Sequence, residues 1–462
     1  MTAQHDTIAA IATPPGSGGV AIIRVSGPLA KTVAQALFVS SRPSFSELKP
    51  YRLHHGHILD APQGKVVDEG LVAFMPGPGS YTGEDVVEFH CHGGPVIVAS
   101  VLRAVLDQGV RAADPGEFTK QAFVNGRMDL SQAEAVAEMI AARSEAGANL
   151  AQRRLSGLMG ERVRALRAEL LALSEQACVA VDFPDDDIEC LPPQDFSRAV
   201  ERVARAVEEL LSGYERARPF EDGVLAVLAG EVNAGKSSLM NALLGRNRAI
   251  VADLPGTTRD YLEESLLVDG MPLRLVDTAG LRETLDSVEQ EGVRMGQDLA
   301  ERADLVLLVK DAGLALSDEE CEFLAKAGAG RVLGVVNKID VSPEGAAGIE
   351  AALAGMGVDS VRISAKTGQG LEELATAIRT KIMHGRHDPA PGELAPNLRQ
   401  SRALAQTLEE LNALVQDIIA GVPYDLLGVR LQTACSLLAE ITGEIAPQEV
   451  LDSIFSRFCI GK

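Results

Sequence analysis

What the chain lacks narrows the classes of protein to which it can belong. It contains no tryptophan, and aromatic residues make up 4% of its 462 residues. No apolar run approaches the roughly 20 residues of a membrane-spanning helix, so we expect no membrane-embedded domain. Its six cysteines form no C-x-x-C pair, which argues against a zinc ribbon or a disulfide framework and predicts a cytoplasmic location; they are Cys91, Cys178, Cys190, Cys321, Cys435 and Cys459.

The chain also lacks net positive charge. Its formal charge is -22, which excludes a broadly basic nucleic-acid-binding surface, so any contact with RNA must be local or supplied by a partner. One local group of arginines occurs in a predicted helix, where the alternative is a solvated face that also carries Glu161 and Glu169. We favour the solvated face for these residues, which are Arg153, Arg154, Arg162, Arg164 and Arg167.

The most informative stretch runs from Val224 to Leu239 and reads V-L-A-V-L-A-G-E-V-N-A-G-K-S-S-L. It predicts a strand that ends at Gly230 and a helix that begins after Lys236. The spacing G-x(4)-G-K-S is that of a phosphate-binding loop, whose small residues expose backbone N–H groups, whose lysine reaches the outer phosphates and whose serine hydroxyl binds Mg²⁺. We therefore predict nucleotide contacts from Asn233, Ala234, Gly235, Lys236, Ser237 and Ser238.

Three further signatures follow in order, each at the end of an apolar run. The D-x-x-G motif is predicted to hold Mg²⁺ through water and to contact the terminal phosphate; it comprises Asp277, Thr278, Ala279 and Gly280. The N-K-x-D motif selects guanine, because its carboxylate can accept two hydrogen bonds that adenine does not offer; it comprises Asn337, Lys338 and Asp340. The last signature is Ser364, Ala365 and Lys366. Together the four predict a GTPase.

The periodicity of the remaining chain predicts a multidomain α/β architecture. Residues 1–120 mix strand and helix patterns, whereas residues 121–222 and 383–462 are predominantly helical. Residues 223–382 contain the nucleotide signatures. The simplest arrangement is a mixed α+β N-terminal domain followed by a discontinuous α-helical domain, into which a Ras-like P-loop GTPase domain is inserted.

Two local patterns carry more specific expectations. Ser131 and Glu134 can form a capping box at the start of the helical region. Glu88, His90 and His92 alternate on one face of a predicted strand, where we expect satisfied polar contacts in preference to a metal site.

The machinery for hydrolysis is less explicit. The residue after D-x-x-G, often a glutamine that orients the attacking water, is Leu281, so an acid must take that role. Four acids follow: Glu283, Asp286, Glu289 and Glu291. Arg259 and Arg282 could neutralise charge, or could equally be surface salt-bridge partners. In the preceding loop, Thr257 or Thr258 is expected to complete the Mg²⁺ shell. Asn233, together with nearby carbonyl groups, could hold a monovalent cation.

Two motifs in the N-terminal region and the last four residues add a family resemblance. They are T-I-A-A-I-A-T-P-P-G-S-G-G-V-A-I-I-R-V-S-G, P-G-P-G-S-Y-T-G-E-D-V-V-E-F-H-C-H-G-G and the ending Cys459-Ile460-Gly461-Lys462. With the GTPase signatures, they make the chain resemble the MnmE (also TrmE) family of tRNA-modifying GTPases over essentially its whole length.

The resemblance implies several ligands. The family's N-terminal domain is similar to folate-binding modules, forms a homodimer and binds 5-formyl-tetrahydrofolate near the dimer interface, at positions that match Arg24, Glu88, Arg127 and Lys462. The family's potassium ion, which takes the place of an arginine finger, matches the Asn233 side chain and the carbonyl groups of Ala252, Leu254 and Thr257. Its Mg²⁺ ligands match Ser237 and Thr258, and the nucleotide contacts extend to Asp253, Pro255 and Gly256. Its water-positioning carboxylate matches Glu289.

The resemblance also implies a reaction and a partner. With the flavoprotein MnmG, the family adds an aminomethyl or carboxymethylaminomethyl group to carbon 5 of the wobble uridine of certain tRNAs, and its G domains pair across the dimer when GTP and potassium are bound. Cys459 is then a candidate for a direct chemical role.

This chain departs from the family pattern at two places. Val232 replaces the proline of G-x-P-N-x-G-K-S. Where most members have V-D after the next strand, this chain has Val309-Lys310-Asp311, and we expect the additional lysine to be peripheral. Two other functions remain open. A ribosome-assembly GTPase would share the nucleotide signatures but predicts an RNA-binding module. A one-carbon transferase with a regulatory GTPase predicts an acceptor site.

Overall fold

The computed structural model describes residues 6–182, 192–247, 263–277, 301–383 and 392–462. It separates into two compact units, each assembled from segments far apart in the sequence. The first comprises Met1–Ile140, Arg154–Ala204 and Gln406–Lys462, and the second comprises Ala141–Arg153 and Arg205–Ala405. In the described part of the chain, every helix is either too short or too polar to cross a membrane.

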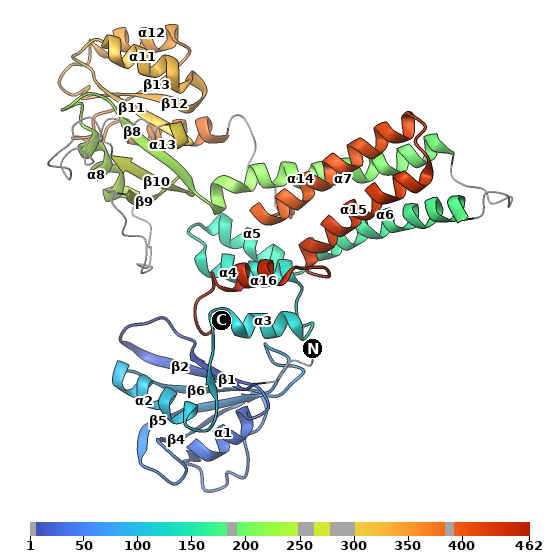
Figure 1. Ribbon diagram of the computed structural model, residues 1–462. Helices are drawn as coiled ribbons and strands as arrows, with labels where there is room; N and C mark the ends of the chain where they lie inside the picture. Colours follow the sequence, from blue (N-terminus) through green and yellow to red (C-terminus); the bar gives the residue numbers. More distant parts are fainter. Residues whose placement is uncertain (1–5, 183–191, 248–262, 278–300, 384–391) are drawn as a thin grey trace, which may run out of the picture. The chain divides into compact units, whose positions relative to one another are not determined.

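A seven-stranded sheet, ordered β3-β4-β5-β6-β2-β1-β7, forms the N-terminal part of the first unit (Figure 1). Two helices, α1 (Ala30–Leu37) and α2 (Pro95–Leu106), pack their apolar residues against the buried face of this sheet. A third helix, α3, spans Glu117–Val124. The strands are β1 (Ile8–Ile11), β2 (Gly18–Ser26), β3 (Phe38–Ser40), β4 (Leu53–Leu59), β5 (Val66–Met75), β6 (Val86–Gly93) and β7 (Arg111–Ala112).

Alternation along β6 decides which side chains are available for function. Val87, Phe89 and Cys91 are buried in the core beneath α1 and α2. Because successive side chains of a strand point to opposite faces, the intervening residues Glu88 and His90 lie on the other face of the sheet. The sequence pattern therefore placed the polar residues of this strand correctly.

The rest of the first unit is helical. Helix α6 (Leu158–Asp182) packs lengthwise against α15 (Tyr424–Thr442). On α15, Arg430 forms ion pairs with Glu410 and Asp417 of the neighbouring helix α14. The remaining helices, which in part belong to the second unit, are α4 (Leu130–Ala141), α5 (Glu145–Leu155), α7 (Pro193–Glu221), α14 (Leu398–Ile419) and α16 (Gln448–Phe455).

The capping box predicted for α4 was wrong in its register. Ser131 is buried inside the helix, and Asp129 occupies the capping position instead. The Oδ1 atom of Asp129 accepts from the Gln132 backbone N–H at 3.0 Å, and the Gln132 side chain accepts from the Asp129 backbone N–H at 3.0 Å. An Asp–Gln pair makes the same reciprocal bonds as a Ser–Glu pair, so two neighbouring patterns competed for one helix start.

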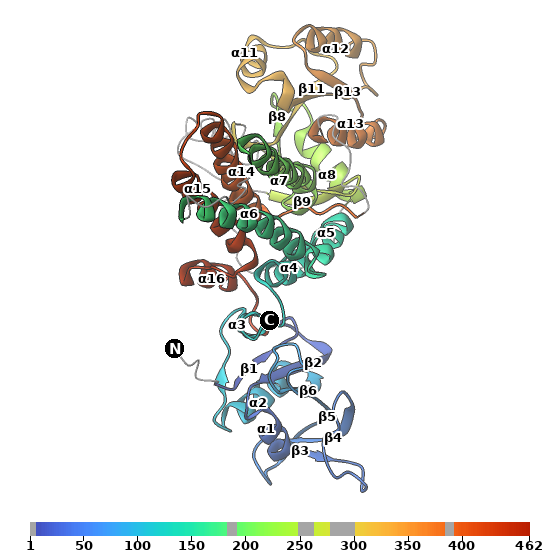
Figure 2. The same cartoon turned by 90° about the vertical axis from the view of Figure 1, so that its right-hand side faces the viewer.

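The second unit contains a six-stranded sheet of order β13-β12-β11-β8-β10-β9, in which all neighbouring strands are parallel except β9 and β10. Helices cover both faces, as Figure 2 shows. The strands are β8 (Val224–Ala229), β9 (Glu263–Val268), β10 (Met271–Asp277), β11 (Leu305–Asp311), β12 (Val332–Asn337) and β13 (Asp359–Arg362). The helices are α8 (Lys236–Asn247), α11 (Asp318–Ala327), the 3₁₀ helix η1 (Ala329–Arg331), α12 (Ala346–Gly355) and α13 (Leu371–Met383).

Two apolar cores hold this sheet in place. Leu305, Leu307 and Val309 of β11 pack on the side of α8 and α13, whereas Val306 and Leu308 pack on the side of α11 and α12. In such a doubly covered parallel sheet, ligands bind at the carboxyl ends of the strands. All four nucleotide signatures follow strand ends of this kind, so the topology brings them to one edge.

Candidate functional site

The phosphate loop connects β8 to α8 and depends on two glycines. Gly230 has φ 131° and Gly235 has φ 100°, backbone angles that residues other than glycine rarely adopt. A Cβ atom on Gly230 would lie 2.1 Å from the Val309 carbonyl oxygen, and one on Gly235 would lie 2.2 Å from the Asn337 side-chain nitrogen. The loop is therefore pressed against the ends of β11 and β12.

Two side chains of the loop, predicted to contact phosphate and Mg²⁺, have defined partners. Lys236 is 7% exposed, and its Nζ atom donates to the carbonyl oxygens of Gly230 at 3.0 Å and Glu231 at 2.8 Å. The hydroxyl of Ser237 donates to Oδ2 of Asp277 at 2.9 Å. A hydroxyl beside a buried carboxylate is an oxygen-only set of the kind that Mg²⁺ prefers, so these residues fit the ion.

The base-recognition motifs are hydrogen-bonded directly to the phosphate loop. The Asn337 side chain donates to the Ala234 carbonyl oxygen at 2.9 Å and accepts from the Ala365 backbone N–H at 3.0 Å. The Lys338 Nζ atom donates to the Asn233 carbonyl oxygen at 2.6 Å. Buried Asn337 thus ties the loops after β8, β12 and β13 into one structure.

Asp340 and Ser364 form the pair expected to meet the base. The hydroxyl of Ser364, which is fully buried, donates to Oδ1 of Asp340 at 2.7 Å. Asp340 itself is exposed, as is Lys366. An exposed carboxylate held by a buried hydroxyl can accept hydrogen bonds from a guanine at a defined position.

Lys338 is oriented from its other side by Asp311. Its Nζ atom lies 2.8 Å from Oδ2 of Asp311, whose Oδ1 accepts from the Gly313 backbone N–H at 2.9 Å. Burial tends to raise the pKa of Asp311, but these two hydrogen bonds outweigh it and hold the pKa below its ordinary value. The carboxylate consequently stays ionised at neutral pH and keeps Lys338 in place.

Part of the predicted nucleotide site lies outside the described residues. This applies to the loop residues Ala252, Asp253, Leu254, Pro255, Gly256, Thr257 and Thr258, to Thr278, Ala279 and Gly280, and to Glu289 with the other acids that follow Leu281. The described side of the site consists of Asn233 to Ser238, Asp277, and the residues after β12 and β13.

A second polar cluster lies on the N-terminal sheet. Arg24 of β2 contacts Glu88 of β6, with 2.9 Å between Nε and Oε1, and its Nη1 atom donates to the Gly461 carbonyl oxygen at 3.3 Å. The Arg24 guanidinium lies between the rings of Tyr81 and Phe118, 5.7 Å and 5.8 Å from their centroids. A Cβ atom on Gly461 would lie 2.3 Å from the Ile11 carbonyl oxygen, so the C-terminal tail is closely seated against β1.

The charges in this cluster affect one another. The hydrogen bond with His90 is the largest cause of the lowered pKa of Glu88; burial opposes it, and the charge of Arg24 reinforces it. Burial, followed by the charge of Arg24, lowers the pKa of Lys462. The structure therefore brings together Arg24, Glu88 and Lys462. Arg127 packs its aliphatic part against Gly83, where an added Cβ would lie 3.2 Å from its Cγ.

The polar residues of β6 and the arginine group have structural partners. His92 lies 2.8 Å from the buried carboxylate of Asp68 and Glu88 contacts Arg24, so the expectation of satisfied polar contacts is confirmed for these two residues, whereas His90 makes a longer contact of 3.4 Å with Glu88. The solvated face expected for the arginine group was wrong for Arg154, which is 1% exposed and pairs with Glu138 at 2.9 Å. Arg164 pairs with Asp129 at 3.1 Å, and Arg167 pairs with Glu444.

Cys459 is exposed, whereas Cys91 and Cys435 are buried. Burial, and then the charge of Asp68, raises the pKa of the Cys91 thiol to about 11. Burial likewise raises the pKa of Cys435. Of these three thiols, Cys459 is the one that a reagent or substrate can reach in the folded chain.

One residue of the nucleotide unit was misjudged. Lys310, expected to be peripheral, is 1% exposed and forms ion pairs with Glu231 and Glu320. A lysine that interrupts the apolar run Leu305–Val309, followed by the capping-box pattern Ser317-x-x-Glu320, was the available signal.

Comparisons with known proteins connect these two clusters to one family. The family model described as the MnmE helical domain matches residues 130–459, and that described as the GTP-binding protein TrmE N-terminus matches residues 7–127. The tRNA modification GTPase MnmE of Nitratidesulfovibrio vulgaris (strain DP4) is 55% identical over 462 residues, covering 99% of this chain and 100% of that protein. The chain belongs to the MnmE family.

As a member of this family, the chain is a GTPase that hydrolyses GTP and acts in tRNA modification. The MnmE of Lawsonia intracellularis is 43% identical, again over 99% of this chain and all of the relative. These matches confirm the predicted fold class. In that class an α+β N-terminal domain is followed in sequence by a helical domain, into which a P-loop GTPase domain is inserted. The G domain of the Thermotoga maritima FeoB iron transporter is 30% identical over 35% of this chain and 97% of that chain, but its TM-score of 0.26 adds nothing to the assignment.

Proposed function

We propose that this chain is a potassium-activated GTPase that works with an MnmG-type flavoprotein to add a carboxymethylaminomethyl or aminomethyl group at carbon 5 of the wobble uridine of certain tRNAs. The observation that best supports the nucleotide part is the hydrogen bonding of Asn337 to both Ala234 and Ala365. These hydrogen bonds join the phosphate-binding and guanine-binding motifs. The carboxyl-end edge of the six-stranded sheet could therefore hold both the phosphates and the base of one GTP.

The phosphate contacts follow from the loop. The backbone N–H groups from Asn233 to Ser238 would surround the β-phosphate, and the Lys236 ammonium would donate to an outer phosphate. Ser237 and Thr258 would bind Mg²⁺, with Asp277 reaching it through water. The ion would neutralise charge on the phosphate oxygens as the bond to the γ-phosphate breaks.

The potassium site would use the Asn233 side chain with the backbone carbonyl groups of Ala252, Leu254 and Thr257. The supporting observation is that Asn233 adopts φ 65°, a left-handed conformation in the middle of the phosphate loop. Its side chain is exposed, and its own carbonyl oxygen is already held by Lys338. The side-chain oxygen is thus positioned by a backbone that cannot easily rotate.

Glu289 would orient the water that attacks the γ-phosphate. The argument is chemical: Leu281 has no polar atom, so a carboxylate from the acidic segment must accept a hydrogen bond from that water. Thr278, Ala279 and Gly280 would contact the terminal phosphate, which couples hydrolysis to the position of this segment. We propose that this coupling drives pairing of G domains across a homodimer and the conformational switching of the helical domain.

The N-terminal cluster would bind 5-formyl-tetrahydrofolate at Arg24, Glu88, Arg127 and Lys462. In support, Arg24 and Lys462 place two cations near the single carboxylate of Glu88, and burial, followed by the charge of Arg24, lowers the pKa of Lys462. An anionic ligand, such as the glutamate tail of a folate, would relieve this repulsion. The folate would supply the one-carbon unit, which this chain's residues would hold at the N-terminal domain of a homodimer.

The test is mass spectrometry of nucleosides from total tRNA of a strain that lacks this protein. Loss of the 5-aminomethyl-type uridines, restored by the intact gene but not by Glu289→Ala, would support both the pathway and the need for hydrolysis. An unchanged profile would refute the pathway and favour ribosome assembly, which a ribosome gradient would then examine.

The exposed thiol near the C-terminus is tested in the same strain. Complementation with Cys459→Ser should lower the modified nucleosides if Cys459 takes part in the chemistry. Complementation with Cys321→Ser, at a half-buried cysteine on α11, is the matched control. Normal nucleoside levels with Cys459→Ser would remove Cys459 from the mechanism.

A further inference from the structure

A lysine is buried behind the phosphate loop, in a position that phosphate binding alone does not explain. Lys310 lies near the end of β11, on the face that packs against α11 and α12. It is 1% exposed, whereas the phosphate-binding lysine, Lys236, belongs to the loop itself. Because an isolated buried ammonium is very costly, its partners indicate what it does.

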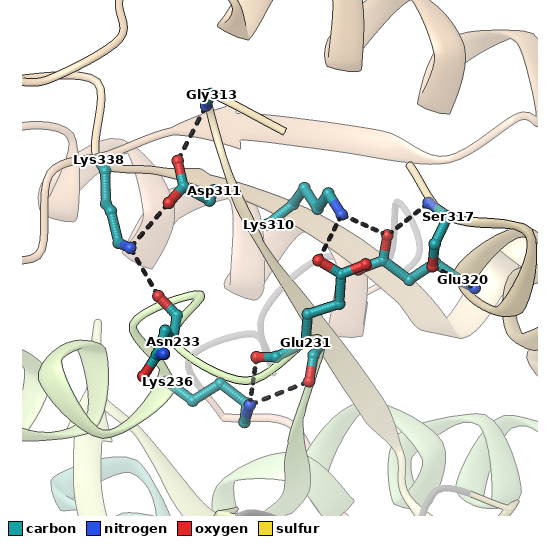
Figure 3. Close-up of polar contacts among 10 residues, drawn as sticks. Glu231, Asn233, Lys236, Lys310, Asp311, Gly313, Ser317, Glu320 and Lys338 are labelled. Carbon is teal, nitrogen blue, oxygen red and sulfur yellow. Dashed lines mark hydrogen bonds and ion pairs between the residues drawn. The ribbon is translucent and has the colours of Figure 1, made fainter. Parts of the chain in front are cut away.

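The ammonium of Lys310 bridges two carboxylates from different segments (Figure 3). Its Nζ atom is 2.7 Å from Oε2 of Glu320 and 3.1 Å from Oε2 of Glu231. Glu320 is fixed independently, because its Oε2 atom also accepts from the Ser317 backbone N–H at 3.0 Å in the capping box of α11. Glu231, which belongs to the phosphate loop, is therefore paired with a lysine that the capping box of α11 holds in place through Glu320.

The next residue of β11 holds the same loop from the opposite side. Asp311 pairs with Lys338, which donates to the Asn233 carbonyl oxygen. Successive residues of a strand point to opposite faces, so Lys310 and Asp311 secure two loop positions that flank Val232. Figure 3 shows both connections converging on the loop from β11.

Val232, between the two secured positions, is 72% exposed. A valine leaves the backbone φ angle free, in contrast to a proline, which holds it near one value. The contacts of Lys310 and Lys338 then add to those that Lys236 makes inside the loop with the carbonyl oxygens of Gly230 and Glu231, and together they keep the first half of this loop in one conformation. The charge balance agrees: burial alone would lower the pKa of Lys310, but its hydrogen bonds with Glu320 and Glu231 outweigh burial and raise it.

We propose that Lys310 is a positioning residue for GTP, which acts through Glu231 to hold the first half of the phosphate loop in the conformation that receives the phosphates. Lys310 does not touch the nucleotide. A loop released from this contact samples other conformations, so nucleotide binding must first select the competent one, and the apparent affinity falls in proportion. The inference rests on the phosphate loop being the GTP site, as proposed above.

The test uses the full chain with two variants and a control. Glu231→Ala removes the half-exposed partner and leaves the buried Lys310–Glu320 pair intact, so the variant should fold. Lys310→Met combined with Glu320→Gln removes both buried charges and leaves the loop sequence unchanged, while glutamine still serves the capping box. The matched control is Glu322→Ala, which breaks a surface pair with Lys326 on the same helix.

Binding of GDP to the unchanged chain, measured first, tests the proposed site itself, and the variants then test Lys310. We expect Glu231→Ala to raise the Kd for GDP and the KM for GTP about tenfold, with kcat changed less than about twofold. The melting temperature without nucleotide should stay within about 2 °C of the parent. The control should match the parent in every measurement.

Combining Glu231→Ala with Lys310→Met and Glu320→Gln separates a linked contact from two independent ones. If Lys310 acts through Glu231, the two losses do not add. The Kd of the combined variant for GDP should then equal the higher of the two values measured for Glu231→Ala and for Lys310→Met with Glu320→Gln. Fully additive losses would overturn the proposal, as would parental GDP affinity in Glu231→Ala. The second criterion stands even if removal of the buried charges prevents folding.

Discussion

The buried hydroxyl of Ser364 donates to Oδ1 of Asp340 at 2.7 Å. The two residues come from different strand ends, β13 and β12, and meet because these strands are parallel neighbours. The bond orients an exposed carboxylate toward the place where the base of GTP would lie. The guanine selectivity that we propose would therefore depend on the parallel pairing of two strands as well as on the N-K-x-D motif.

Asp340→Asn should exchange guanine for xanthine as the preferred base. The carboxylate would accept two hydrogen bonds of about 1.5 to 3 kcal/mol each from guanine, so we expect the affinity for GDP to fall at least about a hundredfold. Xanthosine diphosphate should gain affinity, because the asparagine side chain offers a donor to its additional carbonyl group. Competition with a fluorescent nucleotide measures both constants.

Ser364→Ala is the matched control for this exchange. It removes the orienting hydroxyl but retains the carboxylate that contacts the base, so GDP binding should weaken by about tenfold or less, without any gain for xanthosine diphosphate. Retention of parental GDP affinity by Asp340→Asn would show that Asp340 does not read the base.

GTP turnover should be faster in potassium chloride than in sodium chloride at equal ionic strength. Asn233→Gly should abolish the difference, because glycine removes the side-chain oxygen while accepting the φ of 65° that alanine would resist. The backbone carbonyl group that Lys338 holds is still present in this variant. Equal rates in both salts for the unchanged chain would refute the potassium site, and a persistent difference in Asn233→Gly would remove Asn233 from it.

Glu289→Ala should slow GTP turnover while leaving nucleotide affinity nearly unchanged. A group that orients the attacking water contributes about 10²- to 10⁴-fold to the rate, and it does so without binding the ground-state phosphates. Single-turnover kinetics and the Kd for GTP separate the two effects. Glu283→Ala and Glu291→Ala, in the same acidic segment, are the controls and should retain turnover. If Glu289→Ala loses GTP binding, its role has been misassigned.

Thiol labelling should distinguish Cys459 from Cys91 across the pH range. The thiolate is the reactive form, and with a pKa of about 11 the buried Cys91 would be about one part in a thousand thiolate at pH 8. As the pH rises toward that pKa, the thiolate fraction at Cys91 grows about tenfold per pH unit, whereas Cys459 is exposed and accessible to the reagent. Iodoacetamide labelling followed by peptide mapping measures each site. Rapid labelling of Cys91 at pH 8 would contradict its burial.

Sequence reasoning succeeded where function depends on local spacing. The G-x(4)-G-K-S and N-K-x-D motifs predicted a GTPase, which the family match confirms, because each motif consists of residues only a few positions apart at the ends of strands that apolar runs make easy to recognise. The alternation along β6 was equally readable, because a period of two places Glu88 and His90 on one face in any sheet.

Sequence reasoning failed at the start of α4, where two nearby capping patterns compete. Asp129-x-x-Gln132 and Ser131-x-x-Glu134 both satisfy the rule for a helix start, and their difference lies in which residue the folded chain buries. Ser131 is fully buried in the folded chain. Local propensity contains no information about that burial.

The amino-acid sequence by itself determined the GTPase signatures, the family and the order of α and β segments, since each is written in short-range patterns. The tertiary structure alone decided that Lys310 is buried between Glu231 and Glu320, and that the C-terminal Gly461 meets Arg24. These contacts join residues separated by 10 to 437 positions. Their existence follows from how strands pair and helices pack, and the environment of a charged side chain is set by those distant neighbours.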